Sequence, residues 1–222
     1  MQKFWNFMQG EGENRVLLLE GEIASESWWG DEITPKMFKD ELNSGSGDVV
    51  VVINSPGGDI FAAATIYDAL RGYAGKVTVR ISALAASAAS VVAMAGDEIL
   101  ISPTAQIVIH NPQTVAMGES SEMKKAARAL DSIKEGIINA YEQKTKLSRA
   151  VLSHMMDKET PMDANEAIRL GFADGLLYAV SNSLLAKMRE GVQNAEKQTA
   201  QPPQPTGVPA EQLERRLHLL QY

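Results

Sequence analysis

Two side chains of this sequence, Ser87 and His110, have the types and surroundings that suit nucleophilic catalysis. Ser87 lies in a run of small residues (ALAASAAS) at an expected strand-to-helix transition, where a hydroxyl is exposed and unpaired helix N–H groups face developing charge. His110 ends an apolar segment, from which it can reach a neighbouring nucleophile as a general base. Each residue alone also has a structural explanation, and Ser82 and Ser90 compete with Ser87 for the role.

A pair of glycines, Gly57-Gly58, follows Pro56 after an apolar run. Glycines adopt backbone dihedrals that are forbidden to other residues and can therefore turn an N–H toward a ligand. By spacing alone the better interpretation is a tight turn over residues 54–59 that joins a strand to a helix. The segment does not match a phosphate-binding loop, which needs Gly-x-x-x-x-Gly-Lys-Ser/Thr.

Composition excludes several other kinds of site. The chain has no cysteine, which rules out disulfides, cysteine-ligated metals and thiol catalysis. It has three histidines, of which His154 and His218 have no chemical neighbours of note, so we expect no metal and no cofactor. The net charge of −7 argues against a nucleic-acid partner.

The length of 222 residues fits one α/β domain with a short appendage. No signal peptide is visible at the N-terminus, and the most apolar run, residues 83–95, is too short to span a bilayer. We therefore expect that run to be a buried helix, and the protein to be cytoplasmic without a membrane partner.

Strand and helix patterns alternate along the chain, which is typical of a layered α/β fold. Continuous β-branched runs predict strands covered on both faces, and spacings of three and four predict helices. The expected strands are 16–19, 47–53, 76–81, 98–101 and 106–109, and the expected helices are 34–42, 60–73, a short one around 87, 119–146, 148–156 and 163–170.

The longest predicted helix, 119–146, carries a near-heptad apolar stripe formed by Met123, Ala126, Leu130, Ile133, Ile137 and Tyr141. This stripe either packs on the chain's own core or mates with another subunit, and the pattern favours neither. From about Asn194 the composition changes. Residues 193–209 are Pro/Gln-rich and predict a flexible linker, and residues 210–222 form a short amphipathic segment that needs a partner to be stable.

The motifs become specific in combination. In order along the chain stand Asn54-Ser55-Pro56-Gly57-Gly58, Ile66-Tyr67-Asp68, Ala85-Ala86-Ser87-Ala88-Ala89, Ile109-His110-Asn111-Pro112, Glu166-Ala167 and Gly171-Phe172-Ala173-Asp174. This order resembles the proteolytic subunit of the Clp protease, a serine peptidase of the ClpP/crotonase fold. Trp28-Trp29, Gly58-Asp59, Ala95-Gly96-Asp97-Glu98 and Glu159-Thr160 are similar to the phage and prophage branch that matures heads.

The resemblance implies that Ser87 is the nucleophile and His110 its general base, with the backbone N–H groups of Gly58 and Ala88 forming the oxyanion hole. The third triad position, an Asp in housekeeping members, is occupied here by Glu159 when counted from either side. Glu159 is the favoured acid. Asp157 is the alternative if the loop is remodelled, and a further option is an acid that engages weakly until the protein assembles.

The resemblance also implies a repeated β-β-α superhelical fold with a long protruding helix over residues 15–192. Residues 1–14 are expected to form an N-terminal segment before this domain. It implies homo-oligomeric rings. We expect a serine endopeptidase that processes phage scaffold or capsid protein in a prohead. The alternatives are a general degradation subunit that works with an ATPase unfoldase and a catalytically silent scaffold or acyl-CoA binder of the same fold.

Overall fold

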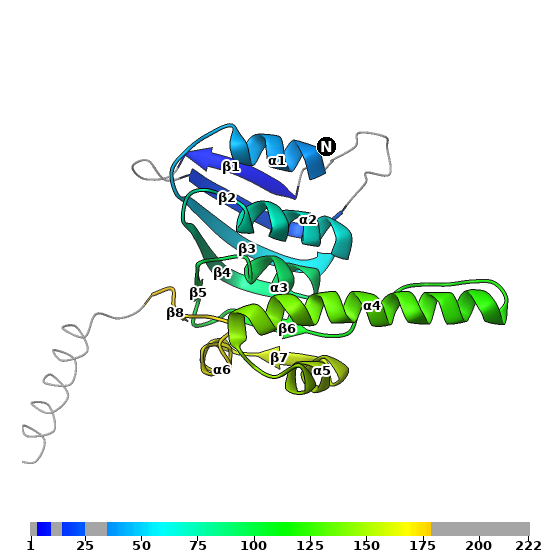
Figure 1. Cartoon of the computed structure of the whole chain (residues 1–222). Helices are drawn as coiled ribbons and strands as arrows, with labels where there is room; N and C mark the ends of the chain where they lie inside the picture. The colour runs from blue at the N-terminus through cyan, green and yellow to red at the C-terminus, as the bar shows by residue number, and fades with distance from the viewer. Residues whose placement is uncertain (1–3, 10–14, 25–34, 179–222) are drawn as a thin grey trace, which may run out of the picture. The chain divides into compact units, whose positions relative to one another are not determined.

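The computed structural model describes residues 4–9, 15–24 and 35–178, which form a mixed α/β unit built on one sheet (Figure 1). The predicted linker and amphipathic tail lie outside the described residues, as do Trp28 and Trp29. Within the described ranges no helix is long and apolar enough to cross a membrane.

The strands are β1 (Trp5–Gln9), β2 (Arg15–Ile23), β3 (Val49–Gly58), β4 (Val77–Ala86), β5 (Glu98–Ile101), β6 (Gln106–Ile109), β7 (Thr160–Met162) and β8 (Gly175–Leu176). In the sheet they follow the order β1-β2-β3-β4-β5-β8, while β6 pairs with β4 and β7. The helices are α1 (Pro35–Asn43), α2 (Ile60–Arg71), α3 (Ala88–Ala93), α4 (Ser120–Thr145), α5 (Arg149–Asp157) and α6 (Ala164–Arg169). The predicted α/β class is therefore confirmed.

The centre of the sheet is parallel and apolar. β2 pairs with β3, and β3 with β4, in parallel register, with Val51 opposite Val79 and Ile53 opposite Ile81. These four side chains lose all or nearly all of their exposure to water. β-branched residues pack well on such a pleated surface, and their burial supplies the main stabilisation of the sheet.

Strand β4 divides its pairing between two neighbours on one side. Its first half, Thr78–Ile81, pairs with β5, and its last residues, Leu84–Ala86, pair with β6. β4 ends at Ala86 and β6 ends at Ile109, so the parallel pairing brings both carboxyl ends to one place. The residues that follow, Ser87 and His110, therefore start from adjacent strand ends, as ligand-binding residues often do in α/β sheets.

The predicted tight turn at 54–59 is wrong in its extent, because β3 continues through Gly58. Ser55 pairs with Ala85 on β4, and its hydroxyl donates to the carbonyl oxygen of Gly21 at 2.6 Å. The amide of Gly57 in turn donates to the Ser55 hydroxyl at 3.1 Å. These bonds satisfy the backbone locally and keep the Gly-Gly segment in the sheet after its register has shifted.

Helix α4 agrees with the predicted 119–146 to within one residue at each end. Its apolar stripe is divided: Ile137 and Tyr141 are 7% and 1% exposed, while Met123 near the start is 38% exposed. The last turns of α4 therefore pack on the core of this chain. The stripe residues between Met123 and Ile137, which are Ala126, Leu130 and Ile133, are partly buried.

Lys146 ends α4 in the left-handed conformation, with φ 61° and ψ 12°, and its amide donates to the carbonyl of Glu142. That conformation costs a residue with a Cβ about 1–2 kcal/mol and costs glycine little. Glycine removes this strain but loses more chain entropy on folding, which offsets part of the gain. We therefore expect Lys146→Gly to raise the free energy of unfolding by about 0.5–1 kcal/mol. Urea unfolding measures it; a lower free energy for the variant contradicts the assignment of this cap.

Candidate active site

Ser87 has a strained backbone at the junction between β4 and α3. Its φ of 54° and ψ of −128° are rare for a residue with a side chain, and its amide donates to the carbonyl of Val108 on β6 at 2.9 Å. Its hydroxyl makes no hydrogen bond among the described residues. Strain of this kind gathers at functional sites, and a sharp strand-to-helix turn that exposes a hydroxyl is the geometry of a nucleophilic serine.

The two glycines lie against this turn. Gly57 has φ 98°, and a Cβ added there would lie 2.7 Å from the carbonyl oxygen of Ala86 and 2.7 Å from the Cβ of Ser87. Gly58 has φ 141°, and its Cβ would lie 2.1 Å from the carbonyl oxygen of Ile23. Both positions therefore require glycine, at Gly57 so that the backbone can lie against the Ser87 turn and at Gly58 so that it can lie against β2.

The two rival serines do not share this setting. Ser90 is fully buried, and its hydroxyl is bonded to Tyr141 and to the carbonyl of Ser87. Ser82 lies earlier on β4, where its hydroxyl donates to the carbonyl of Ile53 at 3.1 Å. Among the three, Ser87 is the one with a free hydroxyl at the cavity described below.

His110 follows β6 directly and its ring is half-buried. Its Nδ1 lies 2.6 Å from the carbonyl oxygen of Asn111. A carbonyl can only accept, so the bond assigns the proton to Nδ1 and leaves the lone pair of a neutral ring on Nε2. This is the tautomer that a general base for a serine hydroxyl requires.

One cavity of about 550 Å³ brings these residues together. Gly58, Ser87, Ala88 and His110 line it, and small and apolar side chains of α4 form another part of its wall: Ala126, Ala129, Leu130, Ile133 and Ile137. Four of the five predicted site residues thus face one space of a size that holds a small ligand or a peptide side chain. The sequence predicts these four residues as neighbours, but its pattern does not indicate that α4 forms a wall of the same cavity.

The fifth predicted residue, Glu159, directly precedes β7. In the antiparallel pair of β6 and β7, Ile109 stands opposite Thr160, and His110 and Glu159 are the residues just beyond this last pair. Glu159 has φ 48° and is exposed, and its carboxylate makes no hydrogen bond within the described residues. The structure therefore brings Glu159 to the neighbourhood of His110 without joining them.

Asp157, the alternative acid, is bound elsewhere. One of its oxygens accepts from Lys134 Nζ on α4 at 2.6 Å and from Asn111 Nδ2 at 2.9 Å. The hydrogen bond from Lys134, followed by that from Asn111, lowers the pKa of Asp157. Because its pKa is lowered, the Asp157 carboxylate stays charged throughout the pH range in which an ordinary Asp takes up its proton. The contacts with Lys134 and Asn111 are weakened only as the pH falls through the lowered pKa. Asp157 thus anchors the residue after His110, a role that the sequence did not reveal.

These two acids are expected to respond differently to loss of charge. Glu159→Gln should lower kcat by about 10- to 100-fold, less than the loss of a fully engaged triad acid, because the Asn111 carbonyl still holds the tautomer of His110. Asp157→Asn should lower kcat by less than about threefold, since its carbonyl oxygen still accepts from Asn111. Steady-state kinetics on both variants measures this, and the reverse order would make Asp157 the orienting acid.

No group of three or more His, Asp or Glu side chains that could hold a metal ion occurs within residues 4–9, 15–24 and 35–178.

The sequence model of the Clp protease family matches residues 4–179. The chain belongs to the Clp protease family.

Similar members of the Clp protease family include three proteolytic subunits. The chain is 33% identical over 155 residues to the ATP-dependent Clp protease proteolytic subunit 1 of Chlamydia muridarum, covering 68% of this chain and 81% of that one. It is 30% identical over 188 residues to the corresponding subunit of Chlamydia abortus, covering 78% and 98%. It is 28% identical over 164 residues to the proteolytic subunit of Pleurastrum terricola, covering 73% and 83%.

Proposed function

We propose that this Clp-family chain is a serine endopeptidase in which Ser87 is the nucleophile and His110 the general base. The observation that carries the proposal is the strained turn of Ser87, whose hydroxyl is without a hydrogen-bond partner within the described residues and shares a cavity with His110. The tautomer of His110 leaves Nε2 able to accept a proton. The similar subunits are named as proteolytic subunits, which supports a peptidase.

In the proposed reaction the Ser87 oxygen attacks the carbonyl carbon of a peptide bond while its proton passes to Nε2 of His110. The N–H groups of Gly58 and Ala88 donate to the resulting oxyanion. The C–N bond then breaks as His110 returns the proton to the leaving amine. Water, deprotonated by His110, hydrolyses the acyl-enzyme and restores Ser87. Glu159 is the proposed third member of the triad, and it orients His110 once its carboxylate takes the place of the Asn111 carbonyl at Nδ1.

The first test is intact-mass spectrometry after treatment with a fluorophosphonate. One adduct per chain on Ser87, absent from Ser87→Ala and His110→Ala, is the expected result. Ser82→Ala is the matched control, because Ser82 lies on β4 before Ser87 and its hydroxyl donates to the Ile53 carbonyl on the neighbouring strand β3. This variant should label like wild type. A wild-type protein that stays unlabelled when assembled would refute the peptidase and favour a silent scaffold.

Two settings for this peptidase are distinguishable. The similar subunits are named as parts of an ATP-dependent protease, which favours a homo-oligomeric, cytoplasmic degradation subunit that works with an ATPase. The Gly58-Asp59 and Glu159-Thr160 motifs favour processing of phage scaffold or capsid protein in a prohead without ATP. Degradation of a folded substrate that needs an added unfoldase supports the first setting, and discrete cleavage of a capsid or scaffold protein without ATP supports the second.

A further inference from the structure

A buried pair of hydroxyl groups lies beneath the nucleophile and takes no part in the proposed chemistry. Ser90 on α3 and Tyr141 on α4 are 0% and 1% exposed, and their oxygens lie 2.7 Å apart. Ser90 Oγ also lies 2.5 Å from the carbonyl oxygen of Ser87. The chain of contacts therefore runs from α4 through α3 to the backbone of the nucleophile itself.

The direction of these hydrogen bonds follows from the groups involved. The carbonyl of Ser87 can only accept, so the single hydroxyl proton of Ser90 is donated to it. Tyr141 must then donate its own proton to Ser90 Oγ. Burial raises the pKa of Tyr141, so the phenol keeps the proton that this arrangement needs well above neutral pH. Both hydroxyl protons are thereby committed in one direction.

The carbonyl that receives this bond belongs to the same peptide unit as the N–H of Ala88. A trans peptide is planar, and its C=O and N–H point in opposite directions. Holding the Ser87 carbonyl toward Ser90 and the protein interior therefore turns the Ala88 N–H the other way, and Ala88 lines the cavity together with Gly58. The amide of Ser90 also donates to this carbonyl, at 3.0 Å, so the hydroxyl is the second of two anchors.

We propose that Ser90 and Tyr141 are positioning residues that fix the Ser87–Ala88 peptide and so aim the Ala88 N–H at the oxyanion. The inference rests on the proposed function, because an oxyanion forms here only if Ser87 attacks a carbonyl. The φ of 54° and ψ of −128° at Ser87 are unfavourable for a residue with a side chain and must be imposed by surrounding bonds. Tyr141 also lines the cavity, but its hydroxyl bonds to Ser90 and to no other described side chain. We therefore expect the hydroxyl of Tyr141 to act through Ser90, which fixes the order of effects below.

The test compares Ser90→Ala, Tyr141→Phe and the double variant, with 4-nitrophenyl acetate as substrate and phenylboronic acid as a tetrahedral mimic. Ser90→Ala should lower kcat by about tenfold, less than loss of a whole oxyanion donor, with KM changed less than about twofold. Tyr141→Phe keeps the ring packed on Phe172 and should lower kcat by about threefold. Affinity for phenylboronic acid should fall in parallel with kcat.

The double variant separates positioning from packing. Because Tyr141 acts through Ser90, adding Tyr141→Phe to Ser90→Ala should leave kcat unchanged. It should raise the melting temperature above that of Ser90→Ala, because the single variant leaves a buried phenol without its partner. Tyr73→Phe is the matched control, since its hydroxyl donates to the Gly47 carbonyl at 2.9 Å outside the cavity, and it should leave kcat and boronate affinity unchanged.

Each outcome has one meaning. Single variants with wild-type kcat and boronate affinity but lower melting temperatures would show that the pair only supports packing and would overturn the inference. Additive losses of kcat in the double variant would also overturn it, since Tyr141 would then act by another route. A wild type that reacts with neither the ester nor a fluorophosphonate refutes the proposed function and the inference with it.

Discussion

Replacing His110 by alanine is expected to lower kcat by about 10⁴-fold or more while KM changes by less than about threefold. The loss is large because His110 is the one imidazole among the described residues that line the cavity with Ser87. KM should hold because the apolar wall from α4 is untouched. The measurement is steady-state hydrolysis of an activated ester, together with the rate of fluorophosphonate labelling.

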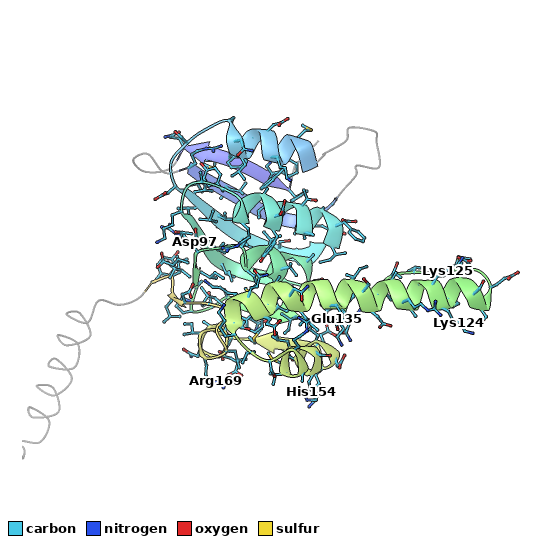
Figure 2. All side chains as sticks on the ribbon, in the orientation of Figure 1. Asp97, Lys124, Lys125, Glu135, His154 and Arg169 are labelled. Atoms are coloured by element: carbon cyan, nitrogen blue, oxygen red, sulfur yellow. The ribbon has the colours of Figure 1, made fainter. Side chains whose placement is uncertain are left out.

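His154→Ala is the matched control for the loss of an imidazole. His154 is exposed on α5, where Figure 2 shows it on the outer side of the helix, and it does not line the cavity. The kcat of His154→Ala should therefore stay within about twofold of wild type. A variant of His110 that labels at the wild-type rate would mean that another group activates Ser87.

Replacing Gly57 by alanine is expected to abolish labelling of Ser87, with a loss of at least about 10³-fold in rate. The new methyl group would lie 2.7 Å from the Ala86 carbonyl oxygen and 2.9 Å from the Ala88 amide nitrogen, at a φ of 98°. All of these neighbours are backbone atoms of the nucleophile turn, so relief of the clash must move the oxyanion donors, each worth about 10²–10³ in rate. The folded state should persist, as judged by circular dichroism.

Gly136→Ala provides the comparison for Gly57→Ala. Gly136 lies inside α4 with nothing within 4 Å of the added Cβ, so its alanine variant should keep the wild-type labelling rate. It should also gain up to about 1 kcal/mol in unfolding free energy, because alanine is the better helix former. Equal labelling of both glycine variants would mean that the approach of Gly57 to Ser87 has no bearing on reactivity.

The sequence predicts the position of most elements but not the extent of each. The expected strands 98–101 and 106–109 match β5 and β6, which are short apolar runs buried in the sheet. The expected buried helix over 83–95 is wrong in its first part, because residues 83–86 belong to β4 and the helix α3 begins only at Ala88. The strands β7 and β8 were not predicted, since elements of three and two residues carry no period. The edge strand β1 was missed as well. The extent of β3 was mistaken because Gly-Gly after Pro is typical of a turn, and the side-chain bond of Ser55 that keeps it extended is non-local.

The candidate site was predictable in part for the same reason. Ser87 and His110 stand out by residue type and by the elements that precede them. The bond between Ser90 and Tyr141 joins residues 51 positions apart, so the sequence showed one as a rival nucleophile and the other as a member of an apolar stripe. The anchoring of Asn111 by Asp157 is likewise a tertiary contact, and no spacing rule predicts it.

The divided pairing of β4 makes chain length a determinant of this site. The amide of Ser102, just after β5, donates to the carbonyl of Ile81 on β4, and residues 102–105 then carry the chain to β6 beside the last residues of β4. One residue more or fewer in this segment would offset β6 along β4 by about 3.3 Å or reverse the faces of its side chains, moving His110 away from Ser87. Substitutions in residues 102–105 should therefore be far better tolerated than insertions or deletions. The length of this segment sets the distance between the base and the nucleophile.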